Sequence, residues 1–507
     1  MKNPHRLLKT FQILTGLAAV VVVILGLALF GVIRLPGSDN PRPSSEEKQT
    51  VSKIKRPKIA ANATYQEYLR QGDELKYQGN FEEATAAYQK ASELESREYA
   101  PYEKIGDVYF LQKNYESALK NFDFAAQLAR QSSALQMKAV RSLIGMRKIL
   151  DAKIRLEKIL PESQATLYYQ GLIAAFLNDQ EKAKDFLSKS LAESSDETLK
   201  TNAQKILTNF RDFELARDGR IEFLQTMLAQ SFDQINEPGL AIELAFDALK
   251  TQHDYRDAWI VLGHAFLAEN KWADSEDALK KAIELDASHP AAYFFRGIAK
   301  LKLAKPNEAI RDFEEALKFG FKPQIQAKQY LADAYFDLKN FEKAYSFYRD
   351  IVSTDPSDME RFVRPMALAI NHVKKPLEAL ELARKAYENH PDTAMGHNLL
   401  GWAAFANDDL PAAHQHLSEA ISRDPELAAA HLNFGQLLQK EGKNEEALRE
   451  YQTAIDLAEK SGNESIGNTA MTRYNEIKTG SGEQKTGNSE MKNEPQREII
   501  PPSLSLE

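Results

Sequence analysis

Apolar residues recur through most of this chain at the spacing of amphipathic helices, in segments of about 12–14 residues separated by short polar turns. Two such segments and their turn form an antiparallel helix pair. Gly72 and Gly106 are 34 residues apart, as are Gly401 and Gly435, so the pair repeats with that period. One pair cannot bury its own apolar face. The pattern therefore predicts an all-α protein, an α-α superhelical solenoid of about eleven stacked helix pairs.

The period also divides the chain into segments. The predicted pairs begin near residues 65, 99, 133, 164, 222, 256, 290, 325, 360, 394 and 428. The phase breaks once, which predicts a first arm over 65–197, a helical inter-array segment over 198–221 and a second arm over 222–461. Residues 462–507 are rich in Gly, Asn, Ser, Glu and Lys. We expect a mostly disordered tail there, with its first part continuing as a capping helix through Ile477.

The N-terminal region has a different pattern. Residues 11–33 are uncharged and almost entirely apolar, long enough for a transmembrane helix of about 34 Å. A cleaved signal peptide is disfavoured, because its apolar core is usually only about 7–15 residues. A short basic tail, 1–10, precedes the span. The segment 34–61 is rich in proline and polar residues and is predicted to be a flexible linker.

The basic residues that flank the span give only a weak indication of its orientation. Lys2, Arg6 and Lys9 precede it, and Arg34, Arg42 and Lys48 follow it. This is nearly a tie under the positive-inside rule. The preceding tail contains no acidic residue, which favours an N-terminus inside and the bulk of the protein on the far side.

The helical repeat resembles the tetratricopeptide repeat. The characteristic positions are filled by Trp259, Gly263 and Phe266 in one pair and by Ala447 and Tyr451 in another. Proteins of this family bind other proteins, and the first helix of each pair lines a concave groove. The resemblance therefore implies a membrane-anchored interaction protein whose partners are other proteins.

Composition narrows the functional classes. The formal net charge is −8, with no basic stripe outside the segments that flank the span, which argues against nucleic-acid binding. The chain has no cysteine, which excludes disulfides and Cys-based metal sites. No nucleotide-binding or nucleophile-elbow motif is present. We expect no enzyme activity, no cofactor, no metal and no small-molecule substrate.

The histidines are the one cluster with potential metal chemistry. His397 and His431 occupy the same repeat position in adjacent pairs, and His414 and His416 lie between them in sequence. Residues at i and i+2 on a helix point about 200° apart, so His414 and His416 do not converge on one ion. These histidines are therefore expected to be structural or at the surface.

The resemblance also identifies candidate groove residues, at positions 5 and 9 of the first helices. In the second arm these are Ile260, His264, Phe294, Ile298, Asn398, Trp402, Leu432 and Gln436. An apolar groove of this kind suits an extended peptide or an amphipathic helix. The alternative is that Phe294 and Trp402 pack within or between repeats. A chaperone-tail clamp is disfavoured, because Leu69 and Asp73 stand where the clamp of some family members has Lys and Asn.

Three functions remain open. The first is a single-pass bacterial inner-membrane protein with an extracytoplasmic repeat domain that supports assembly of envelope or secretion complexes. The second is a cytosol-facing recruitment platform, similar to mitochondrial import receptors or to regulators of lipopolysaccharide assembly. The latter carry a Cys-rich metal knuckle that this chain lacks. The third is a non-catalytic accessory subunit of an enzyme.

Overall fold

The computed structural model describes residues 63–130, 132–161, 163–217 and 219–480. The expected basic tail, transmembrane helix and linker lie outside these residues, as does the end of the C-terminal tail, 481–507. Within the described ranges no helix combines the length and the apolar character needed to cross a bilayer.

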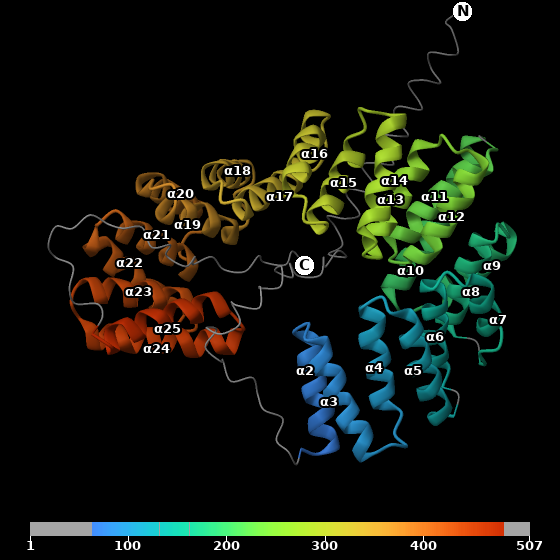
Figure 1. The fold of residues 1–507 in the computed structure, drawn as a ribbon, viewed down its shortest axis with the longest axis horizontal. Helices are drawn as coiled ribbons and strands as arrows, with labels where there is room; N and C mark the ends of the chain where they lie inside the picture. Colours follow the sequence, from blue (N-terminus) through green and yellow to red (C-terminus); the bar gives the residue numbers. More distant parts are fainter. Residues whose placement is uncertain (1–62, 131, 162, 218, 481–507) are drawn as a thin grey trace, which may run out of the picture. The chain divides into compact units, whose positions relative to one another are not determined.

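The described chain is helical throughout, with 24 α-helices and one 3-10 helix in the described ranges (Figure 1). It divides into two compact bodies at the boundary between Lys305 and Pro306. We call the described residues up to Lys305 the N-terminal body and those from Pro306 onward the C-terminal body. The boundary falls within the seventh predicted pair rather than at the predicted inter-array segment, 198–221.

The N-terminal body contains α2 (Tyr65–Tyr77), α3 (Phe81–Leu94), α4 (Ala100–Leu111), α5 (Tyr115–Leu128), α6 (Ser133–Gly145), α7 (Ile149–Leu156), α8 (Gln164–Phe176), α9 (Gln180–Glu193), α10 (Glu197–Ala216), α11 (Ile221–Gln234), α12 (Pro238–Thr251), α13 (Arg256–Ala268), α14 (Trp272–Leu285) and α15 (Pro290–Lys302).

The C-terminal body contains α16 (Pro306–Lys318), α17 (Gln324–Asp337), α18 (Phe341–Thr354), η2 (Met359–Phe362), α19 (Val363–Asn371), α20 (Pro376–Asn389), α21 (Ala394–Ala406), α22 (Leu410–Arg423), α23 (Ala428–Lys440), α24 (Asn444–Ser461) and α25 (Glu464–Lys478). Counting α15 with α16, the described residues hold eleven successive helix pairs, with α10 and α25 as additional helices.

Side-chain caps fix where many of these helices begin. Thr64 and Glu67 form a reciprocal capping box at the start of α2. The side chains of Asn114, Asp179 and Asn340 each accept a hydrogen bond from the backbone N–H three residues later. Such bonds satisfy N–H groups that have no partner inside the helix. In these repeats the last polar residue of the turn therefore caps the N-terminus of the second helix.

Each turn between paired helices also contains one residue in the left-handed backbone region, with φ between +55° and +78°. Glycine, or a polar residue that tolerates this region, fits it with least strain. These residues are Gly79, Lys113, Arg147, Asn178, Asn236, Asn270, Ala304, Lys339, Lys374, Asp408 and Gly442.

The repeated glycines of the first helices make room for a large side chain on the second helix. A Cβ on Gly72 would lie 2.3 Å from the Tyr88 ring, and one on Gly106 would lie 2.5 Å from the Phe122 ring. Gly435 has the same relation to Tyr451, at 2.7 Å. In each case the partner is 16 residues further along. The glycine position therefore lets an aromatic ring pack directly against the backbone of the first helix.

The core of the N-terminal body runs continuously through α10. Ala203, Ile206 and Phe210 of this helix are fully buried and belong to one cluster that extends from α6 to α14. The apolar residues at helical spacing in 197–220 therefore mark an integral part of the core.

The same body contains contacts between repeats that are not neighbours. The start of α12 packs on the end of α6, where a Cβ on Gly239 would lie 2.2 Å from the carbonyl oxygen of Ile144. Nearby, Tyr115 Oη donates to Glu269 Oε1 at 2.6 Å, and both residues are buried. In an ideal solenoid each repeat contacts only its neighbours. Here the chain turns back after α10 and brings separate repeats together.

Candidate protein-binding surface

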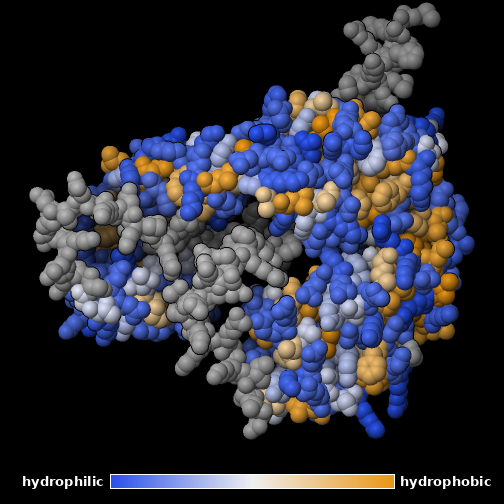
Figure 2. Space-filling view, viewed as in Figure 1, coloured by the Kyte–Doolittle hydropathy of each residue, from blue (hydrophilic) through white to orange (hydrophobic). Residues whose placement is uncertain are grey.

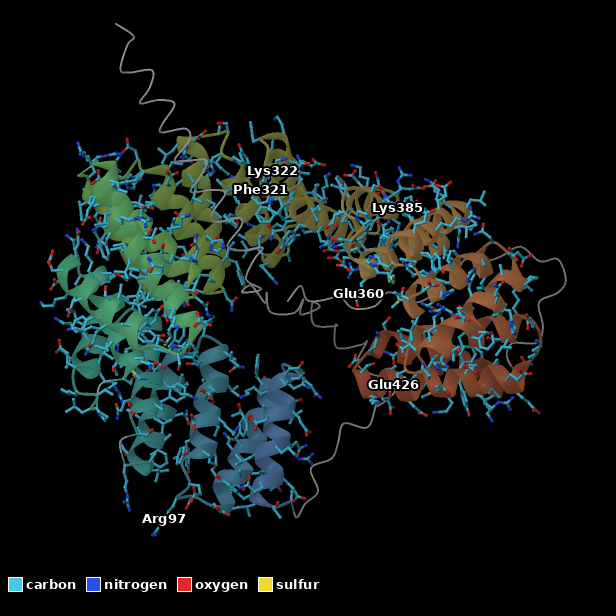
Figure 3. All side chains as sticks on the ribbon, turned by 180° about the vertical axis from the view of Figure 1, so that it is seen from behind. Arg97, Phe321, Lys322, Glu360, Lys385 and Glu426 are labelled. Carbon is cyan, nitrogen blue, oxygen red and sulfur yellow. The ribbon has the colours of Figure 1, made fainter. Side chains whose placement is uncertain are left out.

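Within each body, the first helices of successive pairs lie against one another. Helix α13 contacts α11 and α15 in the N-terminal body, and α21 contacts α19 and α23 in the C-terminal body. Each body therefore has its own face built from first helices, the face on which a groove is expected. Charged side chains such as Arg97 and Glu426 point outward from the turns between the pairs (Figure 3).

In the N-terminal body, the four predicted groove residues differ in exposure. Ile260 and His264 on α13 are partly exposed. Phe294 and Ile298 on α15 are buried, at 2% and 7% exposure. Phe294 is therefore a core residue, as in the alternative interpretation of its position.

His264 has a specific partner on the preceding repeat. Its Nδ1 atom contacts an oxygen of Asp233 on α11, and its ring packs edge-on against Phe295, with 4.5 Å between the ring centroids. Burial alone would lower the pKa of this imidazole, but the Asp233 carboxylate outweighs it and the pKa is raised. His264 therefore joins two repeats and offers only part of its ring to a ligand.

The C-terminal body shows the same division. Asn398 and Leu432 are buried, at 2% and 5% exposure, whereas Trp402 and Gln436 are partly exposed. Asn433 Nδ2 donates to Asn398 Oδ1 at 2.9 Å, which links α23 to α21. Trp402 and Gln436 are thus the predicted residues of this body that a partner can touch.

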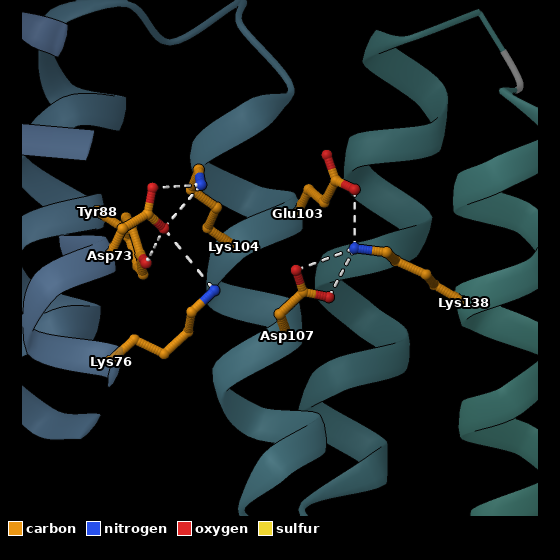
Figure 4. A network of polar contacts seen from close by, with 7 residues as sticks. All are labelled: Asp73, Lys76, Tyr88, Glu103, Lys104, Asp107 and Lys138. Atoms are coloured by element: carbon orange, nitrogen blue, oxygen red, sulfur yellow. Dashed lines mark hydrogen bonds and ion pairs between the residues drawn. The ribbon is translucent and has the colours of Figure 1, made fainter. Parts of the chain in front are cut away.

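A polar network crosses the first helices of the N-terminal body (Figure 4). Lys104 on α4 donates to both carboxylate oxygens of Asp73 on α2, at 2.7 Å each, and Tyr88 Oη donates to the same carboxylate at 2.8 Å. One repeat later, Lys138 on α6 donates to Asp107 at 2.7 and 2.9 Å. Asp73 and Asp107 occupy position 9 of their repeats, so groove positions of the first arm are engaged in ion pairs.

The same arrangement recurs in the C-terminal body. Arg364 Nη1 donates to Asp333 Oδ1 at 2.7 Å and to Tyr348 Oη at 2.8 Å, and Tyr348 donates to Asp333. The offsets of 15 and 31 residues match those of Asp73, Tyr88 and Lys104. This triad was not among the site residues predicted from the sequence. Its signal was an acid at position 9 followed by a basic residue 31 positions later.

Each histidine of this cluster contacts another side chain of the C-terminal body. His397 pairs with His416 through their Nδ1 atoms, 3.1 Å apart, and His431 Nδ1 contacts Glu450 Oε2 at 2.6 Å. His414 instead packs against Phe434. Across the described ranges, no three His, Asp or Glu side chains are placed to hold a metal ion.

A small cavity lies at the contact between α6 and α12. Its volume is about 20 Å³, and Arg141, Glu237 and Gly239 are among its lining residues. This is space for about one water molecule. The cavity therefore has no room for an organic ligand.

The chain belongs to the tetratricopeptide-repeat family. Models of this repeat match residues 69–133, 226–290, 260–320, 294–358, 374–428 and 428–461, which together cover more than half of the chain. The protein is thus a tetratricopeptide-repeat scaffold for protein–protein interaction. Scaffolds of this kind are typically non-catalytic, and the family match assigns no catalytic domain.

Curated relatives are distant. The chain is 25% identical over 296 residues to a DnaJ homolog subfamily C member 3 homolog of Dictyostelium discoideum, which covers 56% of each protein. It is 24% identical over 311 residues to the anaphase-promoting complex subunit cut9 of Schizosaccharomyces pombe, covering 59% of this chain and 44% of that protein. The chain spans about half the length of these relatives.

Similar solved structures include YrrB, described as a tetratricopeptide-repeat protein with an unusual peptide-binding site. It is 21% identical, with 37% of this chain and 95% of that chain covered and a TM-score of 0.32. Yeast Tom70 is 15% identical, with 82% and 96% covered and a TM-score of 0.29.

Proposed function

We propose that this chain is a membrane-anchored scaffold that binds peptides or helices of partner proteins on its first-helix faces and supports assembly of envelope or secretion complexes. The observation that carries the proposal is the combination of a repeat array with an uncharged, apolar segment of 23 residues at 11–33. A scaffold fixed to a bilayer raises the local concentration of the partners that it collects there.

The partner-binding face is proposed to include the partly exposed members of the predicted set, namely Ile260, His264, Trp402 and Gln436. A tryptophan that keeps an accessible edge is a typical anchor for a partner, because its burial removes a large apolar area from water. Trp402 follows Gly401 on α21, and its neighbours Ala403 and Ala404 are buried. The rigid helix beneath it holds the indole in place.

Site-specific photo-crosslinking tests this face. A benzophenone amino acid replaces Trp402 or Gln436 in the full chain, with Glu426 of the same body as the exposed control. The proposal expects a discrete crosslinked protein from positions 402 and 436 and none from 426. Equal crosslinking from all three positions would show that the face has no specific partner.

The topology of the chain is a separate part of the proposal. Protease added outside intact cells or spheroplasts is expected to cut the linker, 34–61, if the repeats lie on the extracytoplasmic side of an inner membrane. Protection until the membrane is opened would instead favour a cytosol-facing recruitment platform.

A further inference from the structure

Helix α7 exposes apolar side chains that no other part of the described structure covers. Leu150 and Ile154 lie one turn apart on this helix and are 63% and 53% exposed. Leu160, shortly after the helix, is 78% exposed. Figure 2 shows apolar residues gathered on this side of the N-terminal body, edged by polar ones. Three large exposed apolar side chains within eleven residues are unusual for a surface that faces water alone.

The same segment is basic although the chain as a whole is acidic. Residues 147–160 contain five basic and two acidic side chains, in a protein with a formal net charge of −8. Lys148, Lys153 and Lys158 are exposed. Arg147 pairs with Glu243, Arg155 with Asp123 and Lys153 with Glu157, whereas no described residue forms an ion pair with Lys148 or Lys158.

We infer that this surface, defined by Leu150, Ile154, Leu160, Lys148, Lys153 and Lys158, rests on the headgroup region of an anionic bilayer. The apolar side chains enter the boundary between headgroups and acyl chains, and the ammonium groups at the ends of their flexible stems contact lipid phosphates. Charge complementarity supports this occupant, since each lysine near an anionic surface strengthens the association about fivefold.

The inference rests on the proposed anchor at 11–33. Three apolar side chains and three lysines form only a weak membrane contact by themselves, but an anchored chain meets the bilayer at high effective concentration. The predicted linker, fully extended, reaches roughly 90 Å, which allows the N-terminal body to lie on the surface. A surface-bound α7 would hold that body in one orientation toward the membrane.

The absence of cysteine makes a direct test possible. The full chain carrying Ile154→Cys, labelled with an environment-sensitive dye, is reconstituted into vesicles of phosphatidylcholine with or without phosphatidylglycerol. Leu94→Cys is the matched control, because Leu94 at the end of α3 is 55% exposed but lies between two acidic residues, Glu93 and Glu95. Leu150→Cys provides a second reporter if the first variant folds poorly.

We expect blue-shifted emission and quenching by nitroxide-labelled lipid at positions 150 and 154 in anionic vesicles, and neither effect at position 94. Lys148→Glu with Lys158→Glu should abolish both effects while circular dichroism stays unchanged. A water-exposed dye at 150 and 154 in anionic vesicles would overturn the inference and leave the surface to an acidic protein partner.

Vesicle flotation separates this outcome from failure of the anchor. A chain that floats with neutral vesicles but keeps an exposed dye at 154 retains its anchor and lacks the α7 contact. A chain that does not float with neutral vesicles lacks the anchor, and its dye response to excess anionic vesicles still reports on α7.

Discussion

At the residue scale, the turns between paired helices concentrate backbone strain in a few exposed positions. Each holds one left-handed residue, and in several repeats that residue is neither glycine nor asparagine. Lys339 has φ +58° and is exposed, whereas Gly442 occupies the equivalent position with φ +78°. A Cβ at Gly442 would meet no atom within 4 Å, so only the backbone distinguishes the two sites.

These two turns give a matched pair of substitutions. Lys339→Gly should raise the free energy of unfolding by about 1 kcal/mol, because glycine adopts the left-handed region without strain. Gly442→Ala should lower it by a similar amount for the opposite reason. Urea unfolding followed by circular dichroism measures both, and the same sign for both would contradict this account of the turns.

At the element scale, helices of neighbouring repeats are joined by polar pairs whose burial differs. Arg364 in the second Asp–Tyr–basic triad is 20% exposed, while Lys104 in the first is 28% exposed and its partner Asp73 is 44% exposed. Arg364 donates a hydrogen bond to Tyr348 as well as to Asp333. Arg364 is therefore in the more buried of the two triads. Removing its side chain would leave polar groups that water reaches less easily without a hydrogen-bond partner.

Neutralising the two basic residues should therefore have unequal effects. Arg364→Met is expected to lower the free energy of unfolding by about 1–3 kcal/mol, because it leaves a partly buried carboxylate and hydroxyl without their donor. Lys104→Met should cost less than about 1 kcal/mol, as for an exposed ion pair. Denaturant titration measures the loss of unfolding free energy in each variant. A larger loss for Lys104→Met than for Arg364→Met would contradict this prediction.

Two histidine contacts on different helices respond to pH in opposite directions. The pKa of His264 is raised, since Asp233 outweighs burial, so its contribution to stability is complete below about pH 6.5 and is lost as pH rises through the folded-state value. The pKa values of His397 and His416 are lowered, chiefly by burial. Their contribution is present above about pH 6.5 and is lost as pH falls.

The corresponding experiment compares His264→Gln and His416→Gln with the natural chain at about pH 5.5 and 7.5. The loss of unfolding free energy caused by His264→Gln should be larger at the lower pH. The loss caused by His416→Gln should be larger at the higher pH. Identical pH dependence in the two variants would show that these imidazoles do not titrate as their contacts indicate.

At the scale of the whole molecule, the described chain forms two compact bodies, and one of them contains a contact between repeats distant in sequence. Gly239 at the start of α12 lies against the carbonyl of Ile144 at the end of α6. Tyr169 Oη donates to Glu237 Oε1 at 2.7 Å beside it. A side chain at position 239 would have to displace backbone, which does not yield as a flexible side chain does.

Gly239→Ala should therefore destabilise the N-terminal body by about 1–3 kcal/mol through overpacking. Hydrogen exchange with mass spectrometry should show lower protection in α5, α6, α12 and α13, with protection in α21 to α24 unchanged. Gly467→Ala is the control, since its Cβ would meet only Ala458 Cβ at 3.3 Å. Loss of protection spread evenly over both bodies would contradict their separation.

The exposure of the predicted groove residues could not be derived from the sequence. Repeat position alone selected Phe294, Ile298, Asn398 and Leu432, which are buried in the structure. Position in a repeat defines which helix carries a side chain, but its exposure depends on how far the neighbouring repeat is rotated. Sequence spacing carries no information on that rotation. Selection by repeat position therefore gave buried residues together with the partly exposed Trp402 and Gln436.

The sequence by itself determined the helix pairs, their 34-residue period and their polar turns, because these follow from local spacing and backbone chemistry. It also predicted the helical segment over 198–221. Only the tertiary structure decided that α10 is part of a continuous core, that the chain divides into its two bodies between Lys305 and Pro306, and that α12 packs on α6. These features depend on small rotations accumulated between repeats, which no single repeat encodes.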